Sequence, residues 1–150
     1  RRNAASGQDQ RYMGGYWLDM PKIDAGLAGC QAAADGVLAG ATVNFLSGSD
    51  ELDPSAATVI NDLAPIMALC AETAGLHAEI GGYTDSSGDP LANLGLSQRR
   101  AVAVRLQLVA RGVPPAALRA VGHGDADPVA DNSTEEGRAK NRRTKITWSQ

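Results

Sequence analysis

The chain has 150 residues, of which 43% are hydrophobic and 21% charged, and its 14 Lys and Arg against 17 Asp and Glu give a formal net charge of −3. These proportions are typical of a globular domain, and they exclude a disordered, collagen-like or membrane-embedded chain, since no apolar run approaches the roughly 20 residues of a membrane span. The acidic balance argues against a dedicated nucleic-acid-binding domain, because such domains carry a basic excess.

The first 40 residues are interpreted as two segments outside the main domain. Residues 1–18 are expected to be a linker or arm of a longer protein, because the first ten are polar and the chain begins without Met. Half of the six aromatic residues lie in this stretch: Tyr12, Tyr16 and Trp17. Residues 19–40 are expected to form an N-terminal helical extension, since apolar side chains recur at helical spacing from Ile23 to Leu38.

Strands and helices are predicted to alternate from residue 41 onward. Residues 41–46 (ATVNFL) predict a strand. A helix follows, capped by Asp53 with Pro54 at its first position, where the missing N–H of proline costs nothing. Pro65 lies inside this helix and should kink or split it. Residues 76–81 (LHAEIG) alternate and predict the second strand.

The second half of the chain continues this order. After a loop, Ser97 is expected to cap a helix over residues 98–111, followed by a strand over 118–122. Thr134 starts a short helix, and residues 144–148 predict a fourth strand. The order β-α-β-α-β-(α)-β, preceded by a helix, indicates an α/β sandwich with helices on one face of a small mixed four-stranded sheet.

Two cysteines, Cys30 and Cys70, leave two interpretations open. Neither belongs to a CxxC pair and the chain has only two His, so no structural metal site is expected. The cysteines are either buried free thiols or a disulfide, which would stabilise the fold by about 4 kcal/mol on the chain-entropy model. A disulfide would also imply an oxidising compartment.

The charges between residues 85 and 100 indicate a candidate binding site. A cap at Ser97 would place Arg99 and Arg100 in the first turn of a helix, where a cation is unfavourable unless an anion binds nearby. Arg99 is expected to point into water. Asp85 follows the second strand at its C-terminal end, where ligands of open α/β sheets bind. We therefore expect Asp85 and Arg100 either to face each other across a pocket or to form a plain structural ion pair.

Two polar segments carry closely spaced motif positions. In GYTDSSGDPLANLGLSQRRAVAV, residues 82–104, these positions are Gly82, Thr84, Asp85, Gly88, Asn93, Leu96, Ser97, Arg100 and Ala101. In VGHGDADPVADNSTEEGRAKNRR, residues 121–143, they are Gly122, Gly124, Pro128, Asn132, Thr134, Gly137, Arg138, Asn141, Arg142 and Arg143. Both segments resemble the OmpA-like peptidoglycan-binding domain of the OmpA C-terminal, Pal and MotB types. Tyr83 replaces the His usual in that family, and Thr144 replaces an apolar residue.

This resemblance implies a domain over residues 41–150 that binds peptidoglycan non-covalently, through the meso-diaminopimelate of its stem peptide, and anchors a cell-envelope protein to the wall. The zwitterionic end of diaminopimelate needs an acceptor for its ammonium, here Asp85, and a forked donor for its carboxylate, here Arg100. The resemblance implies further ligand-binding residues: Phe45, Thr84, Asn93, Leu96, Ser97 and Arg142, with the loop at Ser47 and Gly48 as the other wall. It also favours the Cys30–Cys70 disulfide, because cysteines in similar places resemble those of some actinobacterial members.

We therefore expect a domain of the periplasm or cell envelope, part of an outer-membrane-associated protein, with no enzymatic activity, no cofactor and no membrane insertion. The alternative is a Pal-like or stator-like module whose main partner is another periplasmic protein. A hydrolase built from Ser86 or Ser87, His123 and Asp125 is disfavoured, because no G-x-S-x-G elbow surrounds the serines.

Two charged clusters are also weighed against binding sites. The acidic loop with Asp125, Asp127 and Asp131 lacks the spacing of a calcium-binding loop. A basic cluster near the C-terminus lacks the interleaved aromatics that single-stranded nucleic acid needs. Its members are Arg138, Lys140, Arg142, Arg143 and Lys145.

Overall fold

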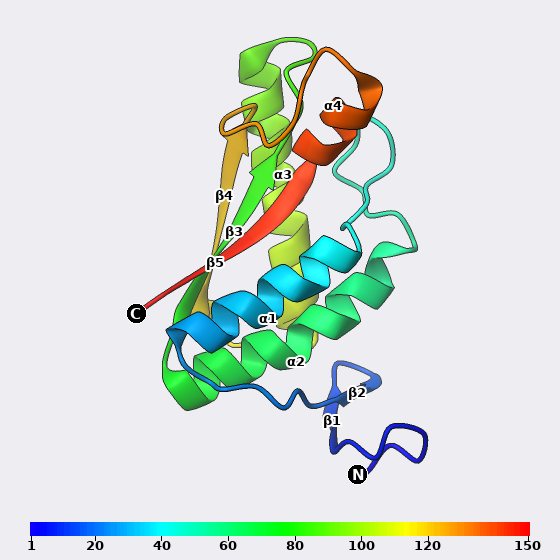
Figure 1. Ribbon diagram of the computed structural model, residues 1–150, viewed down its shortest axis with the longest axis vertical. Helices are drawn as coiled ribbons and strands as arrows, with labels where there is room; N and C mark the ends of the chain where they lie inside the picture. Colours follow the sequence, from blue (N-terminus) through cyan, green and yellow to red (C-terminus); the bar gives the residue numbers. More distant parts are fainter.

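A computed structural model describes all 150 residues as an α/β domain with two small sheets (Figure 1). The elements in chain order are β1 (Gln10–Met13), β2 (Tyr16–Asp19), α1 (Leu27–Gly40), α2 (Ala56–Ala74), β3 (His77–Tyr83), α3 (Pro90–Ala110), a 3₁₀ turn (Pro115–Ala117), β4 (Leu118–Gly124), α4 (Glu135–Asn141) and β5 (Arg143–Ser149). The expected fold class and the N-terminal helix are confirmed, and the order of the later strands and helices follows the sequence pattern.

The main sheet has three strands in the order β4-β3-β5, with β3 parallel to β4 and antiparallel to β5. The strand predicted over residues 41–46 is wrong, so the sheet has three strands and not four. This segment forms only an isolated bridge between Phe45 and Leu52. Its backbone bonds to the loop that follows it, with Leu46 N–H donating to Glu51 O and Asp53 N–H to Asn44 O, so it makes no ladder with the sheet.

Helices cover one face of this sheet, as predicted. Ile80 of β3 and Ile146 of β5 are fully buried, whereas Glu79 and Lys145 alternate with them toward the other face. Helix α3 packs on β3 and β4, while α1 packs on β5 and lies beside α2 (Figure 1). The core is mostly aliphatic, as the shortage of aromatic residues requires.

Side-chain amides of two helices pair with the outer edges of the sheet. Gln31 of α1 donates to Ile146 O at 2.7 Å and accepts from Trp148 N–H at 2.9 Å, along the free edge of β5. Gln98 of α3 donates to Ala120 O at 3.2 Å and accepts from Gly122 N–H at 2.7 Å, along the free edge of β4. Both helices are therefore fixed in register against the strands that they border.

Helix α2 is continuous from Ala56 to Ala74, so Pro65 does not split it. It begins two residues later than predicted, because Asp53 binds the N–H of Ser55 through its carboxylate in a turn before the helix. The left-handed backbone of Gly75 (φ +65°) ends it, a conformation that glycine adopts without steric cost.

Helix α3 begins at Pro90, and the predicted cap at Ser97 is wrong. Asp89 is the N-cap, and its carboxylate accepts from Ala92 N–H at 3.2 Å while Pro90 occupies the first turn. Ser97 is fully buried inside the helix. Arg99 and Arg100 consequently lie near the middle of a 21-residue helix, and the argument from a helix N-terminus does not apply to them.

The first 26 residues contain more structure than a linker. Strands β1 and β2 form a hairpin whose Met13 and Leu18 are buried in the main core. Tyr12 is 61% exposed, whereas the ring of Tyr16 lies under the guanidinium of Arg111. Helix α1 begins at Leu27, later than predicted, and the Cys30–Cys70 disulfide joins it to α2, as the resemblance implied.

Candidate functional site

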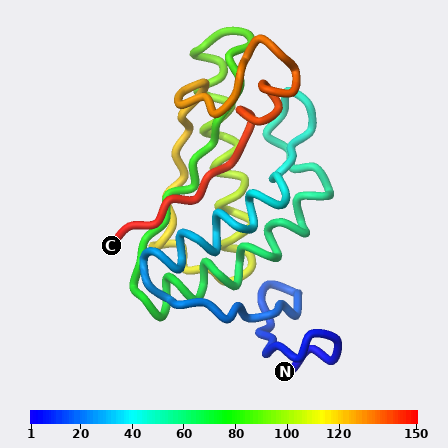
Figure 2. Tube along the Cα trace, in the orientation of Figure 1, coloured from blue at the N-terminus to red at the C-terminus, as the bar shows by residue number.

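A cavity of about 640 Å³ opens between the loop after α1, the end of β3, the middle of α3 and the junction of α4 with β5. Figure 2 shows how the chain brings these segments together, with the cyan loop after α1 running beside the orange-red turns of α4. Six of the residues singled out from the sequence line it: Phe45, Ser47, Gly48, Asp85, Arg100 and Arg142.

Arg100 presents a free guanidinium fork to this cavity. Its Nε donates to Ser49 O at 2.8 Å, and the guanidinium carbon lies 4.9 Å from the centre of the Phe45 ring. Neither terminal nitrogen has a hydrogen-bond partner, so both remain available to a ligand. Burial, and then the positive charge of Arg142, lower the pKa of Arg100, but a guanidinium stays protonated in proteins.

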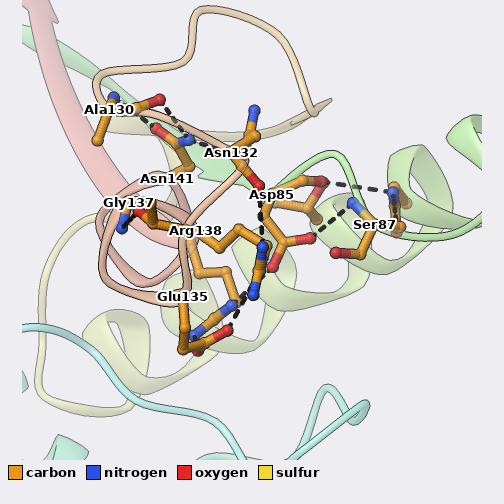
Figure 3. A network of polar contacts seen from close by, with 12 residues as sticks. Asp85, Ser87, Ala130, Asn132, Glu135, Gly137, Arg138 and Asn141 are labelled. Carbon is orange, nitrogen blue, oxygen red and sulfur yellow. Dashed lines mark hydrogen bonds and ion pairs between the residues drawn. The ribbon is translucent and has the colours of Figure 1, made fainter.

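Asp85 is largely buried and accepts two hydrogen bonds. Its Oδ1 accepts from the backbone N–H of Ser87 at 2.8 Å, and its Oδ2 accepts from Arg142 Nη1 at 2.6 Å (Figure 3). Burial alone would raise the pKa of Asp85, but the bonds from Arg142 and Ser87 outweigh it and lower that pKa below its usual value. The carboxylate is therefore ionised, with Arg142 as its counter-charge.

Arg142 connects the cavity to α4. Its Nη2 donates to Glu135 Oε1 at 2.7 Å, so one guanidinium joins two carboxylates from different segments. The pKa of Glu135 is lowered chiefly by this bond, and that of Arg142 is raised by the bonds to Glu135 and Asp85. Asp85 and Arg100 line one cavity without forming an ion pair with each other, because Asp85 pairs with Arg142.

The other predicted residues do not line the cavity, and two of them, Thr84 and Asn93, support the Asp85 loop. Thr84 is buried, and its hydroxyl donates to Asp85 O at 2.9 Å. Asn93 donates to Ser87 O at 2.7 Å, and the Ser97 hydroxyl accepts from Gly124 N–H at 2.9 Å. Leu96 is half-buried and does not reach the cavity.

Two glycines let α3 rest directly on the sheet and so set the position of Arg100. A Cβ atom on Gly82 would lie 2.4 Å from Ser97 O, and one on Gly122 would lie 2.3 Å from the backbone nitrogen of Gln98. Distances this short leave no room for any side chain at either position. Arg100 follows these contacts by less than one turn of helix.

Two charged residues of the cavity, Glu135 and Arg143, were not assigned to the binding site from the sequence, although Arg143 is one of the motif positions. Glu135 precedes Arg142 by seven residues, which is two helical turns, and this spacing is the signal that would have paired them. Arg143 lies over the ring of Tyr83 at 4.0 Å, and Tyr83 stacks on His123 on the sheet face that the helices leave open.

The structure does not bring together the residues of the hydrolase or calcium sites that were considered as alternatives. His123 contacts the carboxylate of Glu79 at 3.0 Å and is hydrogen-bonded to neither Ser86 nor Ser87. No group of three or more metal-ligating side chains occurs in the structure. No helix is long and apolar enough to cross a membrane.

Comparison with known proteins matches residues 44–142 to the OmpA family. The chain is 41% identical over 107 residues to the probable lipoprotein YiaD of Escherichia coli (strain K12), covering 71% of the chain and 48% of that protein. It is 36% identical over 126 residues to the peptidoglycan-binding protein ArfA of Mycobacterium tuberculosis (strain ATCC 25618 / H37Rv), covering 84% of the chain and 37% of that protein. The chain thus spans half or less of the length of these relatives.

Solved structures agree with the fold. The peptidoglycan-associated lipoprotein from Burkholderia pseudomallei aligns with a TM-score of 0.63 at 31% identity, covering 72% of this chain and 89% of that one. The C-terminal domain of Helicobacter pylori MotB aligns with a TM-score of 0.65 at 27% identity, covering 73% and 83%. The relatives also include outer membrane porin F of Pseudomonas fluorescens, 43% identical over 105 residues, covering 70% of the chain and 31% of that protein. Because the relatives include lipoproteins and an outer-membrane porin, the expected location in the cell envelope is confirmed.

Proposed function

Because the chain belongs to the OmpA family, we propose that it binds peptidoglycan non-covalently and thereby anchors a cell-envelope protein to the cell wall. The ligand group is the meso-diaminopimelate of the stem peptide, and the binding site is the cavity that Asp85 and Arg100 line. The role is one of binding and not of catalysis.

The observation that carries this proposal is the free fork of Arg100 opposite an ionised carboxylate. Two parallel N–H groups match the two oxygens of a carboxylate, which is the geometry of a bidentate pair. Asp85 lies across the cavity with its pKa held low, so it can accept bonds from an ammonium group at neutral pH. The cavity therefore offers complementary charges to both groups of a zwitterion.

The surroundings of these two residues strengthen the same match. Phe45 supports one face of the Arg100 guanidinium, so little side-chain freedom is lost when a ligand binds. Arg142 lies between Asp85 and Glu135 and would hold both carboxylates in place while an ammonium approaches. Thr84 and Asn93 would act indirectly, by fixing the loop that carries Asp85. Ser97 would hold the end of β4, where Gly124 O accepts from Thr84 N–H.

Co-sedimentation with purified sacculi tests the proposal. We expect the wild-type domain to pellet, and Arg100→Ala and Asp85→Ala to remain in the supernatant while circular dichroism shows them folded. Loss of a charge-assisted bidentate pair of about 2 kcal/mol corresponds to a roughly 30-fold weaker affinity. Arg99→Ala is the matched control, because the Arg99 side chain is 60% exposed and pairs only with Asp50 at 3.7 Å. Undiminished binding of both site variants would refute the site.

A periplasmic protein partner is the second candidate, and the N-terminal hairpin favours it. Tyr12 and Trp17 stand together with ring centres 5.3 Å apart, and both are substantially exposed. Exposed aromatic side chains are enriched at protein interfaces. If this were the main role, the wild-type domain would stay in the supernatant with sacculi, and the Arg100 and Asp85 variants would behave like it.

A further inference from the structure

A second cavity, of about 570 Å³, continues directly from the first. Arg142, Arg143, Thr144, Tyr83, Ala139 and Thr42 line both cavities, so the two spaces adjoin. Helix α1 forms one wall of the second cavity, and the rest of the lining comes from α4, β5 and the loop at Asp127. A ligand held by Arg100 and Asp85 could therefore extend into it without leaving the protein surface.

The side chains that line this second cavity carry a net positive charge. Four cationic side chains line it, Lys140, Arg142, Arg143 and Lys145, against the carboxylates of Asp35 and Asp127. Lys140 has no ion pair or hydrogen bond, and Lys145 Nζ lies 3.7 Å from Asp35 Oδ1 with no hydrogen bond of its own. The Lys140 ammonium is thus unpaired, and the Lys145 ammonium, held only by this long ion pair, can also contact an anionic group.

The cavity also has an apolar side. Leu38 of α1 and Val129 line it, and Val129 is 61% exposed. A group that fits this surface carries a negative charge at one end and small apolar substituents nearby. A short acidic peptide has this chemistry, and peptidoglycan stem peptides contain alanine and glutamate next to diaminopimelate.

Helix α1 is held rigidly enough to form a wall of a binding site. Both the amide nitrogen and the amide oxygen of the Gln31 side chain form hydrogen bonds with the backbone of β5. The Cys30–Cys70 disulfide links the helix to α2. The helix ends at Gly40 and lies outside residues 44–142, the part matched to the family. This wall is therefore an addition to the part of the chain that the family model describes.

Resting on the proposed function, we infer that the second cavity binds the acidic peptide that continues from diaminopimelate. Lys140 and Lys145 bind its carboxylate, and Leu38 with Val129 contacts its small apolar side chains. The N-terminal helix α1 thereby acts as a specificity element, because it closes a subsite for the peptide that the first cavity does not reach.

Isothermal titration calorimetry with two probes tests this inference. The probes are free meso-diaminopimelate and the tripeptide L-alanyl-D-glutamyl-meso-diaminopimelate. We expect the double substitution Lys140→Gln/Lys145→Gln to weaken tripeptide binding about fivefold, as expected for two partly exposed charge contacts, and to leave binding of the free amino acid unchanged. Lys22→Gln is the charge-matched control, since Lys22 is exposed and lies outside both cavities.

A second pair of variants tests the wall that α1 provides. Ala39→Glu adds a carboxylate to the second cavity at an exposed helical position and should also weaken tripeptide binding selectively. Ala32→Glu adds the same charge two turns earlier on α1, outside the cavity, and should change neither affinity.

The outcomes separate the two proposals. The second subsite is refuted if the wild-type domain binds free diaminopimelate but has no higher affinity for the tripeptide. It is also refuted if the variants lower the affinity for both probes equally. In either case the proposed function stands. If the wild-type domain binds neither probe, the proposed function fails and the inference falls with it.

Discussion

Arg142 contacts Asp85 and Glu135 at once, and so controls how both carboxylates respond to pH. Its bonds lower the pKa of Glu135 and, together with the Ser87 N–H, that of Asp85. A carboxyl group with a lowered pKa in the folded state stabilises the fold fully above its unfolded pKa, about 4. That contribution is lost as the pH falls through the folded value.

The lowered pKa of Asp85 predicts the pH dependence of an Asp85→Asn variant. At pH 7 the variant should be less stable than the wild type, because Arg142 and the Ser87 N–H lose a charged acceptor. Between about pH 5 and 7 the difference in the free energy of unfolding should stay constant, and it should shrink below about pH 4 as the wild-type carboxylate is protonated. Urea denaturation at several pH values measures it, and a difference that grows on acidification would contradict the lowered pKa.

At the scale of the elements, the sequence predicts whether a segment is a helix or a strand better than it predicts where that element begins and ends. β3, β4, β5 and α4 appear where alternation and a Thr134 cap placed them, since their buried residues follow the periods of strand and helix. The predicted start of α3, at residue 98, lies eight residues after its actual start at Pro90. Asn93 and Gly95 made its first two turns look like a loop, and the Asp89-Pro90 cap was overlooked.

The candidate site was predictable from the resemblance to a family and not from the helix and strand pattern. The family motif identified the cavity residues Asp85, Arg100, Phe45 and Arg142, although the electrostatic argument for Arg100 assumed the wrong helix start. The pairing of Asp85 with Arg142 was not predictable, because it depends on how α4 docks across the end of β3. Long-range contacts of this kind leave no periodic signal in the sequence.

The close contact of α3 with the sheet predicts the effect of a single methyl group. Gly82→Ala should lower the free energy of unfolding by about 1–3 kcal/mol, because its Cβ would overlap the backbone oxygen of Ser97 and push the helix outward. Sacculus binding should weaken as well, since Arg100 moves with the helix.

The matched control for this variant is Gly36→Ala. Gly36 lies within α1, and a Cβ there meets no atom within 4 Å, so the variant should gain up to about 1 kcal/mol from helix propensity. Thermal and urea denaturation compare the two. Equal stability of Gly82→Ala and wild type would show that the contact between helix and sheet is less rigid than the distances indicate.

At the scale of the whole molecule, the disulfide joins the N-terminal addition to the family core. Cys30 and Cys70 are 40 residues apart and fully buried. The double variant Cys30→Ala/Cys70→Ala should therefore lose up to about 4 kcal/mol of stability through the loop-closure entropy of the unfolded chain, and more where a cavity remains. Urea denaturation measures the loss.

A reduced wild-type sample serves as the control for that variant, because it removes the cross-link and keeps both sulfur atoms. We expect it to lose stability, while diaminopimelate binding persists in native buffer, since Asp85 and Arg100 lie on segments that the disulfide does not join. A double variant as stable as the oxidised wild type would show that the cross-link adds nothing to the fold.

The N-terminal hairpin also differs from the linker or arm predicted for residues 1–18. The polar start and clustered aromatics suggested an arm, but the hairpin inserts Met13 and Leu18 into the core and places Gly14 against Ala110 and Arg111. Composition missed this because only two of the hairpin's side chains are buried. The domain boundary at residue 41 stays a prediction.

The two glutamines that border the sheet have a consequence for a domain that, as proposed, binds to the surface of a polymer. An unpaired strand edge is a template onto which a neighbouring chain can add a strand, and runaway addition leads to fibrils. The side chains of Gln31 and Gln98 already form hydrogen bonds with backbone groups of β5 and β4 that an added strand would need. If the domain is anchored to the cell wall as proposed, these bonds would disfavour edge-to-edge pairing between neighbouring copies.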